Sequence, residues 1–160
     1  MVDPVLFTIH NAEEAFFMRY RITSITDNAL SYLKEYISTL TYEQFLVALV
    51  VVTVFPYLIA AFGNIGEKGS TAQYLLLLLQ ATIFLNVFSH ISLSLSYQTY
   101  FPGFGTALAI NLPFSFYLLK VGRAGKWISK WSLISMFPLV FLLHGPILWG
   151  LVHISGVVTN

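Results

Sequence analysis

The sequence predicts an all-α protein, a polytopic transmembrane helical bundle with four clear spans and a short N-terminal helix that carries an H-x-x-E-E motif. Hydrophobic residues make up 57% of the 160 residues and charged residues only 9%, whereas an ordinary soluble domain has about 25% charged residues. The apolar residues also gather in four long segments, and about 20 apolar residues in a helix cross the hydrocarbon core of a bilayer. We therefore expect a single integral membrane domain over residues 1–160, with the lipid bilayer as its surroundings.

Each apolar segment is expected to be helical, because a backbone group left unpaired in lipid is very costly. The four predicted spans are 43–63, 72–97, 104–120 and 131–154. A shorter helix is expected over residues 5–19, where acidic residues would be unfavourable in an isolated span and become plausible inside a bundle. Residues 21–42 alternate polar and apolar side chains and indicate an interfacial connector, for which a helical conformation is left open. The alternative for the first helix is an amphipathic helix on the membrane surface.

The distribution of basic residues predicts the orientation. Four of the eight Lys and Arg residues lie in the loop 120–130, which we expect to face the cytoplasm. Parity places residues 63–70 on the same side and the turn at Tyr100 on the outer side, although Arg19 and Arg21 at the outer end run against this rule. We expect the protein in the cytoplasmic (inner) membrane of a bacterium.

Composition excludes several kinds of chemistry. The net charge of +1 and the lack of a long basic patch give no reason to expect a nucleic-acid partner. The chain has no cysteine, which excludes disulfides, thiolate metal sites and cysteine nucleophiles. It also has no nucleophile elbow, phosphate-binding glycine loop or His-Glu-x-x-His motif. Polar residues inside the apolar segments remain as candidates.

The first candidate cluster is His10, Glu13 and Glu14. At 100° per residue these three side chains share one face of a helix, and one imidazole with two carboxylates suits a divalent Zn, Fe or Mn ion. Two adjacent carboxylates near a membrane need a compensating cation or a proton. The alternative is an interfacial face whose carboxylates pair with Arg19 or Arg21.

Two further candidates lie within the predicted spans. Asn86 and His90 are one helical turn apart, so Asn86 could orient the imidazole; the alternative is a single interhelical hydrogen bond. His144 lies near the middle of the last span and is a further candidate ligand, whereas His153 points the opposite way and is expected at the interface. The pair Gly145-Pro146 could open the helix beside His144.

A turn motif follows the second span. In Tyr100-Phe101-Pro102-Gly103 the proline fixes φ and the glycine accepts the positive φ of a type II turn. We expect a rigid cap between two helices, and the alternative is that the turn holds Tyr100 over the cluster as an acid or hydrogen-bond donor.

Three motifs in order give the chain a resemblance. His10-Asn11-Ala12-Glu13-Glu14, a later His90 and the Tyr100-Phe101-Pro102-Gly103 turn resemble the HXXEE domain family, from His10 through the last helix. The resemblance implies membrane association and a shared site made from His10, Glu13, Glu14 and His90. It implies no particular reaction, since the family has no assigned function.

Two classes of function fit these residues. The first is a metal-dependent membrane enzyme in which His10, Glu13, Glu14 and His90 act on a lipid or lipid-linked substrate by hydrolysis or transfer, with His144 completing the metal shell. The alternative is a non-enzymatic accessory subunit of a membrane protein partner, or a small transporter, which uses the same residues for proton or ion handling. In a third interpretation the polar groups only set helix packing.

Overall fold

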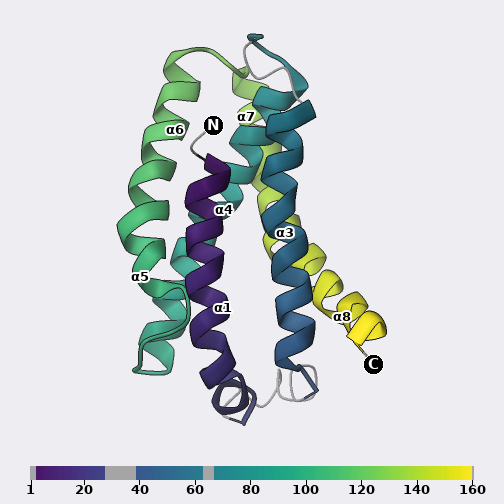
Figure 1. Cartoon of the computed structure of the whole chain (residues 1–160). Coiled ribbons are helices and arrows are strands. Elements are labelled where there is room, and N and C mark those ends of the chain that lie inside the picture. The colour runs from purple at the N-terminus through teal and green to yellow at the C-terminus, as the bar shows by residue number, and fades with distance from the viewer. Residues whose placement is uncertain (1–2, 28–38, 63–66, 160) are drawn as a thin grey trace.

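The structure, a computed structural model, describes residues 3–27, 39–62 and 67–159, and within these ranges it contains helices and no strand (Figure 1). The elements in chain order are α1 (Asp3–Asp27), α3 (Tyr42–Phe62), α4 (Thr71–Ser96), α5 (Phe104–Thr106), η1 (Ala107–Asn111), α6 (Leu112–Ala124), α7 (Lys130–Leu142), η2 (Leu143–Ile147) and α8 (Leu148–Thr159). The symbols η1 and η2 mark single π-helical turns inside longer helices. The prediction of an all-α fold is confirmed.

Four helices are long and apolar enough to cross a bilayer. They cover Tyr42–Ala61, Thr71–Ser96, Phe104–Ala124 and Lys130–Thr159. The third span joins α5, η1 and α6, and the fourth joins α7, η2 and α8. Since a helix of about 20 residues spans the hydrocarbon core, these four agree with the predicted spans and identify an integral membrane protein.

The N-terminal helix is longer than the sequence indicated. We expected a helix over 5–19 and a connector over 21–42, but α1 runs without a break from Asp3 to Asp27. The predicted end of the first helix at residue 19 is therefore too early, residues 21–27 of the connector are helical and continuous with it, and residues 28–38 lie outside the described part of the chain. The physical reason is that α1 contains no proline or glycine after Pro4 to end it, so its polar later turns continue the helix beyond the apolar core.

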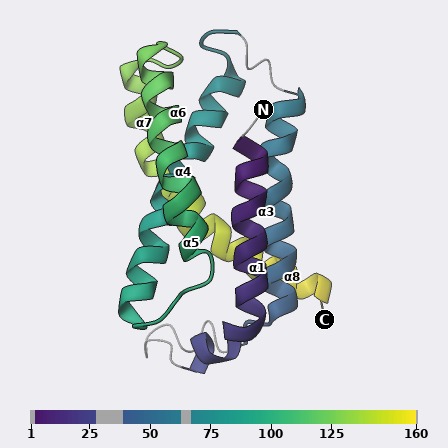
Figure 2. The ribbon, with the colours of Figure 1, turned by 60° about the vertical axis from the view of Figure 1, so that its left-hand side comes forward.

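Helix α1 is inserted between other helices rather than laid on a surface. It packs directly on α3, α5 and η1, and it meets α4 through side chains (Figures 1 and 2). Two hydrogen bonds attach it to α3: Asn11 Nδ2 donates to Thr53 Oγ1 at 2.7 Å, and the hydroxyls of Thr8 and Tyr57 lie 2.9 Å apart. His10 is completely buried. The surface-helix alternative is therefore wrong.

The two π-helical turns coincide with two of the prolines in the apolar segments. Pro113 lies two residues after η1, and Pro146 lies inside η2. A wider turn accommodates a residue that cannot donate a backbone hydrogen bond, and π turns commonly bend a helix. Pro56 and Pro138 instead lie within regular α-helix. The fourth span contacts different helices on the two sides of η2: α7 packs on α4, and α8 packs on α3.

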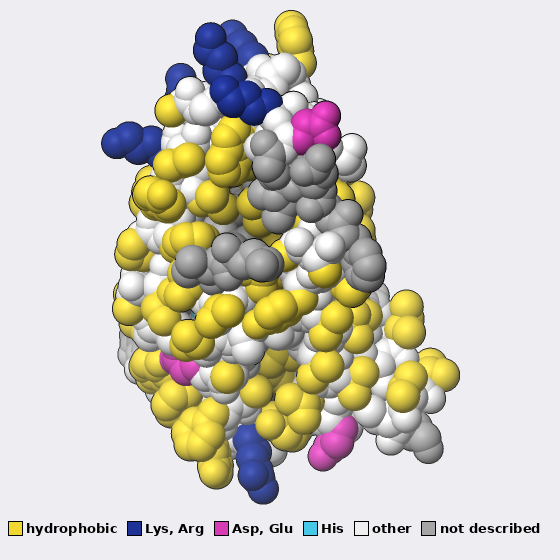
Figure 3. Space-filling view, turned by 45° about the horizontal axis from the view of Figure 1, so that its top comes forward, with side chains coloured by type: hydrophobic (Ala, Val, Ile, Leu, Met, Phe, Trp, Pro, Cys, Tyr) yellow, Lys and Arg dark blue, Asp and Glu magenta, His cyan; other side chains and the backbone are white. Residues whose placement is uncertain are grey.

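The loops separate into two ends. The C-terminal end of α3, the N-terminal end of α4 and the loop between α6 and α7 lie at the same end of the bundle, and the turn between α4 and α5 lies at the opposite end with the C-terminus (Figure 1). Lys and Arg side chains gather at the first end, above an apolar lateral surface (Figure 3). This arrangement agrees with the predicted parity of the loops. That the loop 120–130 faces the cytoplasm stays a prediction.

The apolar core lies where α4, α6 and α7 meet. Its buried members are Leu77, Leu78, Leu118, Met136 and Val140. Helices α4 and α6 approach closely because Gly122 faces Leu77: a β-carbon at Gly122 would lie 2.7 Å from Leu77 Cδ2 and 2.9 Å from Leu77 Cδ1. Small residues at helix interfaces allow such approach in membranes.

We expect Gly122→Leu to lower the free energy of unfolding by about 1–3 kcal/mol, the usual range for overpacking a filled interior. The matched control is Gly150→Leu, because a β-carbon at Gly150 has no neighbour within 4 Å. Unfolding by denaturant titration in detergent micelles measures both variants. Equal stability of the two would contradict the close packing of α4 and α6.

Candidate functional site

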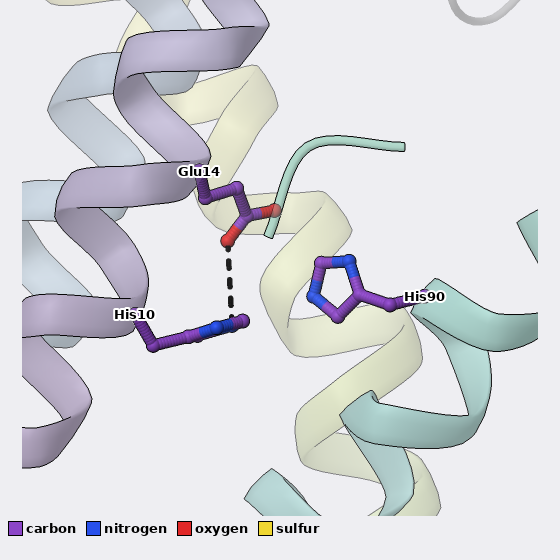
Figure 4. Close-up of side chains that lie close together, drawn as sticks. All are labelled: His10, Glu14 and His90. Atoms are coloured by element: carbon purple, nitrogen blue, oxygen red, sulfur yellow. Dashed lines mark ion pairs between the residues drawn. The ribbon is translucent and has the colours of Figure 1, made fainter. Parts of the chain in front are cut away.

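Three side chains from two helices converge between α1 and α4. His10 and Glu14 lie one turn apart on α1, and His90 lies on α4 (Figure 4). One ligand atom from each of these three residues lies within 4.8 Å of the other two. The exposed fraction is 0% for His10 and 2% for His90, and it is 15% for the Glu14 side chain. We call these three residues the His/Glu group.

Hydrogen bonds fix the orientation of the His10 ring. Its Nδ1 lies 2.8 Å from Thr106 Oγ1, and its Nε2 lies 3.3 Å from Asn86 Nδ2. The same Asn86 amide nitrogen lies 3.0 Å from His90 Nε2. One NH2 group can donate to two ring lone pairs, so this arrangement places the proton of each neutral imidazole on Nδ1. Both Nε2 lone pairs then point into the space between the helices.

The second nitrogen of His90 is buried. Its Nδ1 has no hydrogen-bond partner within the described residues. Metal-binding histidines commonly have their other ring nitrogen held by a hydroxyl, carboxylate or carbonyl. Thr106 supplies such a contact to His10, whereas no described residue supplies one to His90 Nδ1.

The charge of Glu14 is not balanced by Lys or Arg. Among the described residues its one ion-pair partner is His10, with 3.9 Å between Glu14 Oε2 and His10 Nε2. Arg21 instead donates from Nη2 to Thr99 Oγ1 at 2.8 Å. The alternative in which the carboxylates pair with Arg19 or Arg21 is therefore wrong for this part of the chain. Glu14 is a carboxylate that would gain from a bound cation.

Glu13 has a different set of partners. Its carboxylate accepts hydrogen bonds from the Tyr100 hydroxyl, from Gly105 N at 3.3 Å and from Thr106 N at 2.7 Å. Gly103 is the N-cap of α5 and has no side chain that could cap it, so Glu13 caps this helix from α1. A carboxylate that accepts the N2 and N3 amides is the usual cap interaction. Glu13 lies outside the His/Glu group, although it interacts electrostatically with all three members.

Tyr100 donates to this carboxylate. Burial and the hydrogen bond to Glu13 raise the pKa of the Tyr100 phenol above its ordinary value, which keeps the proton on the hydroxyl. The phenol oxygen also accepts a hydrogen bond from Gly105 N at 3.0 Å. Tyr100 is therefore a hydrogen-bond donor to Glu13 from the turn that joins α4 to α5; the rigidity of the turn and a role of Tyr100 as an acid stay predictions.

Gly103 is required at its position for two reasons. Its φ of 81° is the positive value expected for a glycine after Pro102. In addition, a β-carbon there would lie 2.7 Å from His90 Cε1 and 3.0 Å from His10 Cε1. The Tyr-x-Pro-Gly turn therefore closes directly over both imidazoles, which explains why its last residue has no side chain.

The remaining predicted residues lie elsewhere. His144 is half-buried on η2 and its Nε2 lies 2.8 Å from Ser89 Oγ, so it is not brought into the His/Glu group. His153 is exposed beside Trp149, with 4.8 Å between the ring centroids. A further polar residue, Asn111 on η1, is buried, and its Nδ2 has no partner within the described residues.

Sequence reasoning missed Thr106 as a contact of His10. Thr106 forms two contacts at the site, one to the imidazole of His10 and one to the carboxylate of Glu13. The only available signal was its place three residues after Gly103, where the third residue of a helix presents its amide to a cap. The pairing of that amide with a residue 93 positions away could not be inferred from spacing.

The comparisons with known proteins show the family of the chain. A family model described as "Protein of unknown function with HXXEE motif" matches residues 1–118, and the chain belongs to this family. The match includes all three sequence motifs and ends within α6, so it stops short of the last helix to which we extended the resemblance. No curated protein and no solved structure matches the chain significantly.

Replacing Gly103 by alanine tests the close approach of the turn. Gly69→Ala is the control, because Gly69 has a similar φ of 75° and a β-carbon there has no neighbour within 4 Å. We expect Gly69→Ala to cost about 1–2 kcal/mol from backbone strain alone. Gly103→Ala should cost about 1–3 kcal/mol more, because the added methyl group overlaps two imidazoles.

The measurement is the free energy of unfolding of both variants in the same detergent. Equal losses would mean that the turn does not lie against His10 and His90.

Proposed function

We propose that the protein is a metal-dependent membrane enzyme, a hydrolase or transferase whose divalent ion is held by His10, Glu14 and His90. The observation that carries this proposal is the convergence of three ligand atoms within 4.8 Å beside a carboxylate that has no Lys or Arg partner in the described residues. Two imidazoles and one carboxylate are a common set for Zn in hydrolytic enzymes and for Fe(II), and Mn also accepts it.

The surroundings support a ligand role. Both Nε2 lone pairs face the same space and are occupied by a single Asn86 amide, which could rotate away when an ion enters. The contact from Thr106 to His10 Nδ1 holds that ring without using its Nε2 lone pair. We assign Glu13 to the support of the Tyr100 turn, since its oxygens already accept three hydrogen bonds.

The depth of the His/Glu group supports a lipid or lipid-linked substrate. His90 is six residues from Ser96, the last residue of α4, which is about 9 Å along the helix axis. With its 26 residues α4 is about 39 Å long, against a hydrocarbon core of about 30 Å. The group therefore lies just inside the boundary between headgroups and hydrocarbon, at the level of lipid ester linkages.

A bound divalent ion would lower the pKa of a water molecule and polarise the bond to be cleaved. The residues around the ion would position the substrate and transfer protons. Glu14 faces His10 with Oε2, so its second carboxylate oxygen, Oε1, remains. This oxygen is suited to take the proton from the attacking water and to pass it to the leaving oxygen. The neutral imidazoles retain their Nδ1 protons, and the buried surroundings restrict bulk water.

The direct test is the metal content of purified protein by elemental analysis. We expect about one Zn, Fe or Mn ion per chain, and we expect it to be lost in His10→Gln, Glu14→Gln and His90→Gln, because each variant removes one of three ligands. Glu13→Gln should retain most of the metal, since Glu13 stands outside the His/Glu group. Glu43→Gln and His153→Gln are controls that change exposed residues of the same types.

Equal metal in Glu14→Gln and Glu43→Gln would exclude the metal site. Wild-type protein without metal but with a proton-dependent transport activity that Glu14→Gln removes would support the transporter alternative instead.

Metal binding should also raise the stability of the folded state. A ligand at 100 times its Kd stabilises the protein that binds it by about 2.7 kcal/mol, so adding Zn²⁺ to metal-free wild type should raise Tm clearly. The same addition to Glu14→Gln should give little change. A shift of equal size in both proteins would indicate zinc bound elsewhere on the chain.

A further inference from the structure

One arginine lies on the same face of α1 as the His/Glu group, nearer the end of the bundle. Arg21 follows Glu14 by seven residues, which places it within about 20° of Glu14 around the helix and about 10 Å further along the axis. It is half-buried, and its Nη2 donates to Thr99 Oγ1 at 2.8 Å. Thr99 belongs to the segment between α4 and α5, so the turn over the His/Glu group also orients this guanidinium.

Most of the donors of Arg21 remain available. A guanidinium has five N–H donors, and the contact with Thr99 uses one of them. Within the described part of the chain no carboxylate forms an ion pair with Arg21. Arginine recognises phosphate by two parallel hydrogen bonds, and a partly buried arginine without a carboxylate is suited to an anionic ligand.

The aromatic residues around Arg21 favour a position at the level of the lipid headgroups. Tyr20 is 68% exposed, and the rings of Phe17 and Tyr100 lie 5.1 Å apart beside the turn. Tyrosine side chains are enriched at the boundary between hydrocarbon and headgroups. The phosphate of a membrane lipid lies at this level, and its acyl ester linkages lie slightly deeper, toward the His/Glu group.

We propose that the substrate is a glycerophospholipid whose phosphate binds Arg21 while an acyl ester lies at the His/Glu group. The substrate role rests on the proposed function, whereas binding of the phosphate to Arg21 does not. In the reaction the oxygen of water bonds to the acyl carbon, and the bond between that carbon and the glycerol oxygen breaks. One proton of the water goes to the glycerol oxygen, and the products are a fatty acid and a lysophospholipid.

The experiment measures lipid binding by native mass spectrometry of the purified protein in detergent. The probes are phosphatidylglycerol and diacylglycerol with the same acyl chains, and inorganic phosphate in a separate arm. We expect wild type to bind phosphatidylglycerol in preference to diacylglycerol. Arg21→Gln should weaken this binding about tenfold, since charge-assisted hydrogen bonds contribute more than 1.4 kcal/mol, the free energy of a factor of ten.

Arg19→Gln is the matched control. It removes the same charge from the same end of α1, but Arg19 is exposed and lies about 140° around the helix from Glu14, so binding should stay close to wild type. Thr99→Ala keeps the charge of Arg21 and removes its orienting contact, and it should weaken binding by a smaller factor than Arg21→Gln.

Three results would overturn the inference. The first is equal phosphatidylglycerol binding in wild type and Arg21→Gln. The second is an equal loss in Arg19→Gln, which would indicate general attraction of anionic lipid. The third is inorganic phosphate that displaces the lipid completely, which would indicate a site for the free anion. Metal content in the same samples tests the proposed function separately, because Arg21 is not a proposed ligand.

Discussion

The structure depends on the contact between Glu13 and the start of α5. This carboxylate joins the first helix to residues 87 to 93 positions later, through the Tyr100 hydroxyl and the amides of Gly105 and Thr106. The turn in turn places Gly103 against both imidazoles and Thr106 beside His10. Carboxylates are costly inside an apolar bundle, and helix α1 carries two of them, Glu13 and Glu14. The hydrogen bonds to Glu13 offset part of this cost and allow α1 to pack among the other helices.

The two adjacent glutamates therefore have separate tasks that follow from their directions. Glu13 faces α5 and satisfies backbone amides, which a helix start would otherwise leave unpaired. Glu14 lies a further 100° around the helix and faces His10 and His90. The Glu13 carboxylate is occupied by structural hydrogen bonds. The Glu14 carboxylate has no Lys or Arg partner among the described residues, which is the condition under which a bound cation becomes favourable.

Much of this arrangement could be predicted from the sequence. The length of the apolar segments predicts the four spans, because the thickness of the hydrocarbon core sets the length of a spanning helix. The pair Pro102-Gly103 predicts the turn from backbone sterics alone. The convergence of His10 and His90 was implied by the resemblance to the HXXEE domain family, and it agrees with the tendency of polar residues in apolar helices to face inward. The extent of α1 could not be predicted, since a polar helix at the membrane boundary has no hydropathy signal. The different roles of Glu13 and Glu14 also could not be predicted, because they depend on which helix each side chain faces. His144 illustrates the same limit, as it faces Ser89 and not the His/Glu group.

The π turn η1 allows the third span to contact α1 at its start and α4 along its remainder. It follows directly after Thr106 and precedes α6, which carries Ser115, Leu118 and Gly122 against α4. A π turn holds about one residue more than an α turn, which offsets the residues before it by about 100° from those after it. Thr106 can thus point at α1 while α6 keeps its own face on α4. Because of the extra residue, the direction of the side chains before η1 is set independently of the direction of those after it. The start of the helix can therefore contribute to the site while α6 packs on α4.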